Sequence, residues 1–172
     1  MILVALSANL PSRFGSPQQT FHAALKAMEQ AGITSIQPSR IWKTAPWPYN
    51  ETDPWYCNAV CVVETKLGPR EVLTVLLNIE KEFGRVRLEK NVSRSIDLDL
   101  IVYDNQIIRS GLELIVPHPR MQDRAFVLMP MSDVFHGDWQ HPETNVTLDD
   151  MIAAIPRTKE HEATPIEGGW DE

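Results

Sequence analysis

The chain has 172 residues, of which 43% are apolar, and its 16 basic and 23 acidic side chains give a formal net charge of −7. This length suffices for one substantial core, and the acidic balance argues against a surface that coats nucleic acid. No stretch approaches the roughly 18 apolar residues of a membrane span, and the start lacks the basic flank of a secretion signal, so we expect a cytoplasmic protein without a membrane partner.

The first half of the chain predicts the order strand, helix, strand, strand. Ser16 is a suitable N-cap for the helix, Pro17 fits its first position and Gly32 ends it. Long loops in compact domains are usually functional, which makes the proline-rich segment 46–54 a candidate binding loop. The expected elements are a strand over 2–8, a helix from 17 to 32, and strands over 36–43 and 55–65.

The second half adds a helix over 69–83 and a strand over 96–103, which complete a ferredoxin-like βαββαβ order. This is an α+β fold with a mostly antiparallel sheet, helices on one face and additional C-terminal elements. Those elements are a short helix or edge over 124–134 and a capped helix over 147–155. We expect a single domain over 1–155, followed by a loosely ordered tail over 156–172, which holds five acids and little apolar patterning.

Two aspartates lie two residues apart in the apolar run of the last predicted strand. Because strand side chains alternate, Asp97 and Asp99 lie side by side on the face opposite to Leu98. Like charges this close repel unless a cation, a proton or an arginine lies between them. The functional interpretation of this pair is a site for a hard cation such as Mg²⁺ beside substrate phosphates. The alternative is an ordinary sheet with one solvated face.

A basic stretch precedes the acidic pair, with Arg85, Arg87, Lys90 and Arg94 inside ten residues. Guanidinium groups bind phosphate oxygens in bidentate fashion. A polyphosphate that carries Mg²⁺ would satisfy both the arginines and the aspartates. The alternative is a set of salt bridges within the protein, because surface ion pairs are common. Tyr56 and Asn58 have the same non-core parity as the aspartates, so the topology could bring all four side chains to one open sheet face.

These residues resemble the 6-hydroxymethyl-7,8-dihydropterin pyrophosphokinase family of folate biosynthesis, from residue 2 to about residue 155. Four motifs in the right order identify this family specifically, whereas any one of them alone would not. One departure is Ser7-Ala8-Asn9, where the family usually has Gly-Ser-Asn. The motifs are Arg94-x-x-Asp97-Leu98-Asp99-Leu100, Ile79-Glu80-x-x-x-Gly84-Arg85-Val86-Arg87, Tyr56-x-Asn58-Ala59-Val60 and Val116-Pro117-His118-x-x-Met121-x-x-Arg124-x-Phe126.

The resemblance implies that ATP donates its β,γ-pyrophosphoryl unit to the hydroxymethyl oxygen of the pterin and that AMP is released. We expect a monomeric enzyme with small-molecule partners only, and loops 46–54 and 85–94 that close over the substrates. Asp97 and Asp99 would hold two Mg²⁺ ions, and Arg85 and Arg94 would clamp the phosphates. Further implied ATP contacts are Glu80, Arg87, His118 and Arg124, and implied pterin contacts are Thr44, Tyr56, Asn58, Asp97 and Phe126.

Two other functions fit parts of the pattern. A ferredoxin-like RNA-binding module shares the topology, but the chain has an acidic balance and no aromatic-rich strand of the RNA-recognition type. A nucleotide-sugar transferase could use Asp97 and Asp99 as an Asp-x-Asp metal site, although such enzymes usually have a larger α/β domain. His136, Asp138 and His141 form a weak alternative metal group, because their context is loop-like and a fourth ligand is missing.

Overall fold

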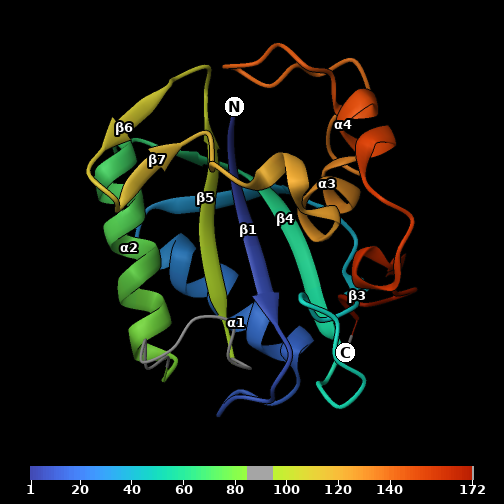
Figure 1. The fold of residues 1–172 in the computed structure, drawn as a ribbon. Coiled ribbons are helices and arrows are strands. Elements are labelled where there is room, and N and C mark those ends of the chain that lie inside the picture. Colours follow the sequence, from blue (N-terminus) through green and yellow to red (C-terminus); the bar gives the residue numbers. More distant parts are fainter. Residues whose placement is uncertain (85–94, 172) are drawn as a thin grey trace.

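An antiparallel sheet forms the centre of the protein in a computed structural model that describes residues 1–84 and 95–171 (Figure 1). The strands follow the order β5-β1-β4-β3-β8, and β2 pairs with β4 beside β3. The bounds are β1 Ile2–Ala8, β2 Ile33–Pro38, β3 Trp42–Thr44, β4 Tyr56–Thr65, β5 Asp97–Tyr103 and β8 Ala163–Pro165.

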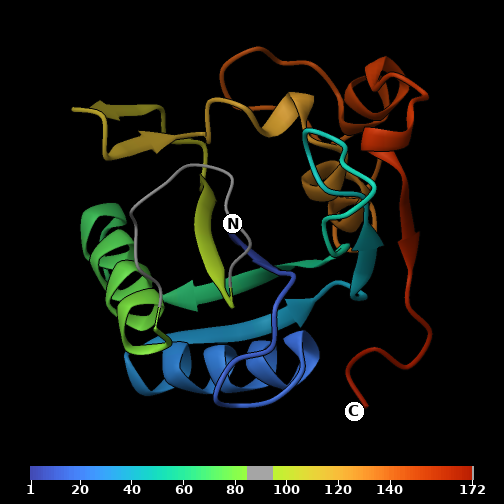
Figure 2. The ribbon, with the colours of Figure 1, turned by 60° about the horizontal axis from the view of Figure 1, so that its bottom comes forward.

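Two helices cover one face of this sheet, α1 over Pro17–Gln30 and α2 over Pro69–Glu82 (Figure 2). Together with β1, β2, β4 and β5 they confirm the predicted βαββαβ order. The core on this face is made of the apolar parity of each strand and one stripe of each helix. Its largest fully buried members include Leu6, Phe21, Met28, Leu76, Ile96 and Leu98.

The helix boundaries follow from their capping residues. The Ser16 hydroxyl accepts a hydrogen bond from the Gln19 backbone N–H at 3.2 Å, and the Gln19 side chain accepts one from the Ser16 N–H at 2.9 Å. This reciprocal pair is a capping box, and it begins α1 where the sequence predicts. Gly32 and Gly84 follow the two helices with φ of +89° and +88°, the left-handed conformation that glycine adopts without strain.

The opposite face of the sheet is covered over part of its area by α3, Ala125–Met131, and α4, Leu148–Ala154. They bury a second core, which contains Leu3, Val60, Val62, Ile101, Leu128 and Met151. The expectation of an open sheet face is therefore wrong where these helices pack. A face covered in this way also lacks the broad exposed platform on which RNA-recognition sheets stack bases.

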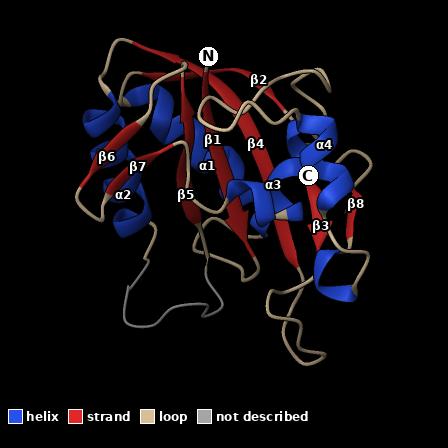
Figure 3. Ribbon diagram, turned by 45° about the horizontal axis from the view of Figure 1, so that its top comes forward, coloured by secondary structure: helices blue, strands red, loops and turns tan. Residues whose placement is uncertain are grey.

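Smaller elements complete the fold. A hairpin of β6, Ile108–Ser110, and β7, Leu114–Val116, lies beside α2 (Figure 3). Two 3₁₀ turns, η1 Met121–Asp123 and η2 Lys159–His161, precede α3 and β8. In the described parts of the chain, no helix combines the length and the apolar composition that crossing a membrane requires.

Two sequence expectations differ from the structure. The strand predicted over 36–43 is divided into β2 and β3, because Pro38 has no N–H to continue the ladder and the Ser39 hydroxyl accepts the Val60 N–H instead, at 3.0 Å. The segment predicted as a loosely ordered tail contributes β8, which pairs with β3. Trp170 in the same segment packs beside the first core.

Candidate active site

The acidic pair lies at the start of β5, on the face that α1 and α2 leave free. The register places Ser7 of β1 opposite Asp97 and Ala5 opposite Asp99. On its other side, Ser7 is opposite Asn58 of β4. Directly opposed residues of antiparallel strands share a face, and neighbouring strands lie about 4.8 Å apart. Asp97 and Asn58 thus face the same side of the sheet, roughly 10 Å apart across β1.

Glu80 holds the strand that carries the acidic pair. Its side chain is 1% exposed, and its Oε1 accepts a hydrogen bond from the Leu98 N–H at 2.8 Å. Leu98 lies between the two aspartates, so this bond ties the site to α2. This positional role of Glu80 was not visible in the sequence, and its contact with ATP stays a prediction.

His118 and Arg124 come to the acidic pair from the segment after β7. The nearest guanidinium nitrogen of Arg124 lies 3.9 Å from Asp99 Oδ2. The His118 backbone N–H donates to the Ile101 carbonyl at 2.8 Å, which fastens this segment to β5. Burial and the nearby Arg124 charge lower the pKa of His118 to about 4, although Asp97 acts in the opposite direction. His118 is therefore neutral at pH 7.

The polar edge of β4 lies across β1 from the aspartates. The Asn58 side-chain amide donates to Thr44 Oγ1 at 2.6 Å, and Tyr56 lies opposite Thr44 in register. Asn58 and Thr44 are both buried. The guanidinium of Arg124, the residue before α3, lies 5.3 Å from the centre of the Phe126 ring. The structure thus brings Phe126 beside the residue that approaches Asp99.

Loop 46–54 forms the wall next to this edge. Residues 46–53 and Tyr56 line a cavity of about 760 Å³, a volume within the range of small-molecule sites. The loop is fastened at its end, because the buried Asn9 side chain donates from Nδ2 to the Pro54 carbonyl at 3.2 Å. At its tip, the Lys159 ammonium lies 5.3 Å from the Tyr49 ring centre. The location fits the sequence-based prediction of a binding loop.

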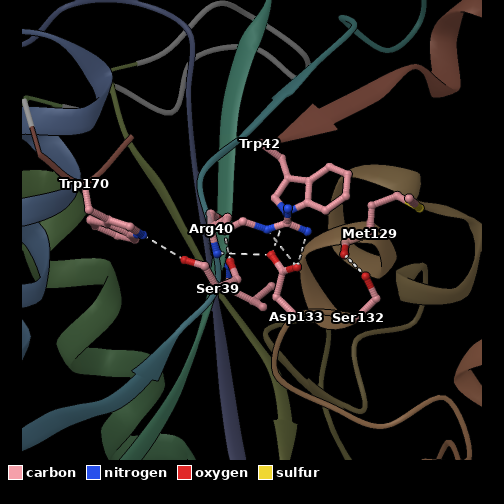
Figure 4. Close-up of polar contacts among 8 residues, drawn as sticks. Ser39, Arg40, Trp42, Met129, Ser132, Asp133 and Trp170 are labelled. Carbon is pink, nitrogen blue, oxygen red and sulfur yellow. Dashed lines mark hydrogen bonds and ion pairs between the residues drawn. The ribbon is translucent and has the colours of Figure 1, made fainter. Parts of the chain in front are cut away.

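One carboxylate connects β3 to α3 (Figure 4). Asp133, just after α3, accepts hydrogen bonds from the Arg40 guanidinium at 2.6 and 3.1 Å and from the Arg40 backbone N–H at 3.1 Å. It also accepts the indole N–H of Trp42 at 2.8 Å. Trp42 is buried and lies opposite Asn58 in register. These contacts fix the distance between the helix of Phe126 and the strand of Thr44.

The structure thus gathers most of the predicted site residues at one end of the sheet. Asp97, Asp99, His118 and Arg124 form its charged side. Its polar and aromatic side consists of Thr44, Tyr56, Asn58 and Phe126. Arg85, Arg87 and Arg94 lie outside the described residues, as does the predicted lid over 85–94.

The carboxylates fit a hard cation that completes its coordination with water and substrate oxygens. Within residues 1–84 and 95–171, no three His, Cys, Asp or Glu side chains gather in a metal-binding arrangement. Mg²⁺ usually takes one or two carboxylates plus phosphate oxygens, so the acidic pair satisfies its needs. In the alternative group, His141 is engaged otherwise, because its Nδ1 accepts the Glu143 and Thr144 backbone N–H groups at 3.2 and 3.3 Å.

Sequence reasoning missed the role of Asp133 between β3 and α3, and it noted Ser7 and Asn9 only as part of a departure from the family pattern. It did not place Asn9 under loop 46–54 or Ser7 between the two polar rows. The parity of β1 could have pointed to Ser7, since it alternates with the buried Leu6 and Ala8. The contacts of Asp133 with Arg40 and Trp42 join residues more than 90 positions apart, and no local sequence pattern predicts such contacts.

The sequence profile of the 7,8-dihydro-6-hydroxymethylpterin-pyrophosphokinase family matches residues 3–136. The 2-amino-4-hydroxy-6-hydroxymethyldihydropteridine pyrophosphokinase of Haemophilus influenzae is 39% identical over 133 residues, which cover 76% of this chain and 79% of that protein. The folic acid synthesis protein fol1 of Pneumocystis carinii is 36% identical over 94% of this chain, but the match spans only 21% of that longer protein.

Solved structures agree on the fold. A triple mutant of Plasmodium falciparum HPPK-DHPS with STZ-DHP superposes with a TM-score of 0.68 over 88% of this chain and 42% of that one. The sequence identity is 14%, so this likeness concerns the fold alone. The match thus covers most of the Haemophilus protein but less than half of the Pneumocystis and Plasmodium proteins.

Proposed function

Because the chain belongs to the 7,8-dihydro-6-hydroxymethylpterin-pyrophosphokinase family, we propose that it transfers a pyrophosphoryl group from ATP to 6-hydroxymethyl-7,8-dihydropterin in folate biosynthesis. The observation that carries the proposal is the row Asp97, Ser7 and Asn58 across β5, β1 and β4. It supports a triphosphate at the aspartates and a pterin at the amide, with the hydroxymethyl group between them.

In the proposed reaction, the hydroxymethyl oxygen forms a bond to the β-phosphorus while the bond from that phosphorus to the α,β-bridging oxygen breaks. AMP leaves, and the hydroxyl proton is lost. Most of what such a transfer needs from a protein is positioning and neutralisation of charge. In this proposal the charged side of the site neutralises the phosphates, and the polar side positions the pterin.

The charged side would bind the triphosphate. Arg124 would exchange its approach to Asp99 for phosphate oxygens, and Arg85, Arg87 and Arg94 are proposed to add further guanidinium contacts. The Arg120 backbone N–H donates to His118 Nδ1 at 3.2 Å, so the ring proton is on Nε2 and can be donated to a phosphate oxygen. Two Mg²⁺ ions on Asp97 and Asp99 would neutralise phosphate charge and make the hydroxymethyl group more acidic.

The polar side would bind the pterin. Asn58 offers an amide to the donors and acceptors at the edge of the ring, and Thr44 fixes the orientation of that amide. Tyr56 and Phe126 supply aromatic faces for a flat heterocycle. A cytoplasmic location, a monomeric state and the absence of nucleic-acid and membrane partners belong to this proposal as predictions.

The test is release of AMP from ATP, followed by chromatography, with and without 6-hydroxymethyl-7,8-dihydropterin and with Mg²⁺ or a chelator. We expect AMP in amounts equal to the pterin consumed, and none when either the pterin or Mg²⁺ is left out. Formation of ADP in place of AMP, or AMP release that ignores the pterin, would overturn the proposal.

A further inference from the structure

Ser7 lies in the middle of the row that joins the acidic pair to the polar edge of β4. It is opposite Asp97 on one side and opposite Asn58 on the other. Opposed residues in antiparallel strands have Cβ atoms about 4.5–5.5 Å apart, so the short Ser7 side chain stands between a carboxylate and an amide. Ser7 thus has one neighbour on the proposed triphosphate side, Asp97, and one on the proposed pterin side, Asn58.

The Ser7 hydroxyl is not needed to hold the fold. Its side chain is half-buried, and among the residues that the structure describes it has no hydrogen-bond partner. Its backbone is regular strand, since Asp104 and Asn145 are the non-glycine residues with positive φ in the described part of the chain. Two residues earlier, Ala5 faces the same side and shows that β1 accepts a methyl group there.

Resting on the function proposed above, we propose that the Ser7 hydroxyl forms a hydrogen bond with the hydroxymethyl oxygen of the pterin and orients it for attack on phosphorus. If the pterin ring binds at Asn58 and the triphosphate at Asp97, the hydroxymethyl group of the pterin lies between them, over Ser7. A serine hydroxyl can donate a hydrogen bond to one lone pair of the hydroxymethyl oxygen, and the other lone pair of that oxygen stays available to attack phosphorus. Such orientation raises the fraction of bound substrate in a reactive geometry.

The inference predicts a coupling between one protein hydroxyl and one ligand hydroxyl. We compare Ser7→Ala with the parent for binding of 6-hydroxymethylpterin and 6-methylpterin, which differ in that hydroxyl, by the fluorescence of the pterin ring. We expect the variant to bind 6-hydroxymethylpterin roughly five-fold more weakly, the value of one ordinary hydrogen bond, and to bind 6-methylpterin as the parent does. Turnover should fall while KM for ATP stays unchanged.

Ser110→Ala is the matched control, because Ser110 is an exposed strand serine in β6 that bonds Arg70. It should leave both affinities unchanged. Ser7→Gly provides a second deletion of the hydroxyl should alanine disturb β1, and circular dichroism checks that each variant is folded. Equal losses for both pterins, or no loss for either, would overturn the role of Ser7. Failure of the parent to bind any pterin would instead overturn the proposed function itself.

Discussion

At the scale of single residues, the two aspartates of β5 are close in sequence and share a face, which is costly for a structural role alone. Glu80 fixes their strand from below, and Arg124 approaches from above. Two adjacent carboxylates repel each other, and a nearby cation such as the Arg124 guanidinium, 3.9 Å from Asp99 Oδ2, reduces the cost of keeping both charges. Their retention fits the binding of a cation and a polyphosphate.

Asp97→Asn and Asp99→Asn are therefore expected to lower AMP formation by about a thousand-fold or more, since each removes charge at the reacting phosphates. The melting temperature should change little, because relief of the repulsion within the pair opposes the loss of favourable contacts such as that of Asp99 with Arg124. Both quantities are measured on the purified variants, by chromatography and calorimetry.

Asp138→Asn is the matched control for the aspartate variants. Asp138 is an exposed aspartate of the loop before α4 and belongs to the alternative metal group. Full activity in this variant and loss in the other two would exclude that group. Retained AMP formation in either β5 variant would refute the metal assignment.

His118 gives a prediction on pH. Its pKa is lowered to about 4 from an ordinary value near 6.5, chiefly by burial. The folded protein binds this proton less well than the unfolded chain, so acid favours unfolding. The contribution of His118 to stability is fully present above pH 6.5 and is lost as the pH falls toward 4, by at most about 1.4 kcal/mol per pH unit.

His118→Gln should remove this part of the pH dependence, and urea unfolding at pH 4.5 and pH 7 measures it. The difference in unfolding free energy between the two pH values should be smaller in the variant than in the parent. A direct check is the titration of the His118 ring by NMR, and a midpoint near 6.5 in the folded protein would contradict the prediction.

At the scale of secondary structure, the link between β3 and α3 depends on Asp133. Asp133→Ala leaves the buried indole N–H of Trp42 without its acceptor, which costs about 1–3 kcal/mol. For a chain of this size that corresponds to a fall in melting temperature of roughly 5 °C. Asp133→Asn keeps an oxygen for the indole and should lose less. The same melting temperature in both variants and the parent, by calorimetry, would show that the link does not stabilise the fold.

The elements that the sequence predicts well are those with local signals. Ser16 and Pro17 mark the start of α1, Gly32 lies two residues after its last residue, and strand parity places Asp97 and Asp99 correctly. For α3 the sequence does not decide between a short helix and an extended edge, because the element has seven residues and contains Pro130. Its packing on β4 brings distant segments into one core, which contains both Leu128 and Val60, and periodicity does not reveal such packing.

At the scale of the whole molecule, the sheet is covered on both faces, and the site is what remains uncovered at one end. The long-range contacts that produce this arrangement include the segment after α4, which returns to pair β8 with β3. Composition favoured a loose tail there, since five acids and two glycines dominate it. The segment is nevertheless ordered, and one aromatic residue in it, Trp170, packs against the first core.

Trp170→Ala should therefore destabilise the whole domain. The Trp170 indole N–H donates to the Ser39 carbonyl at 2.7 Å, and its ring centre lies 6.3 Å from that of Phe21 on α1. Since the side chain is half-buried, we expect a loss of about 2 kcal/mol in the free energy of unfolding, less than for a core tryptophan. Trp170→Phe keeps the ring contact but not the hydrogen bond and should lose about half as much. Urea unfolding followed by circular dichroism measures both. If residues 156–172 contributed nothing to the fold, both variants would unfold at the same urea concentration as the parent.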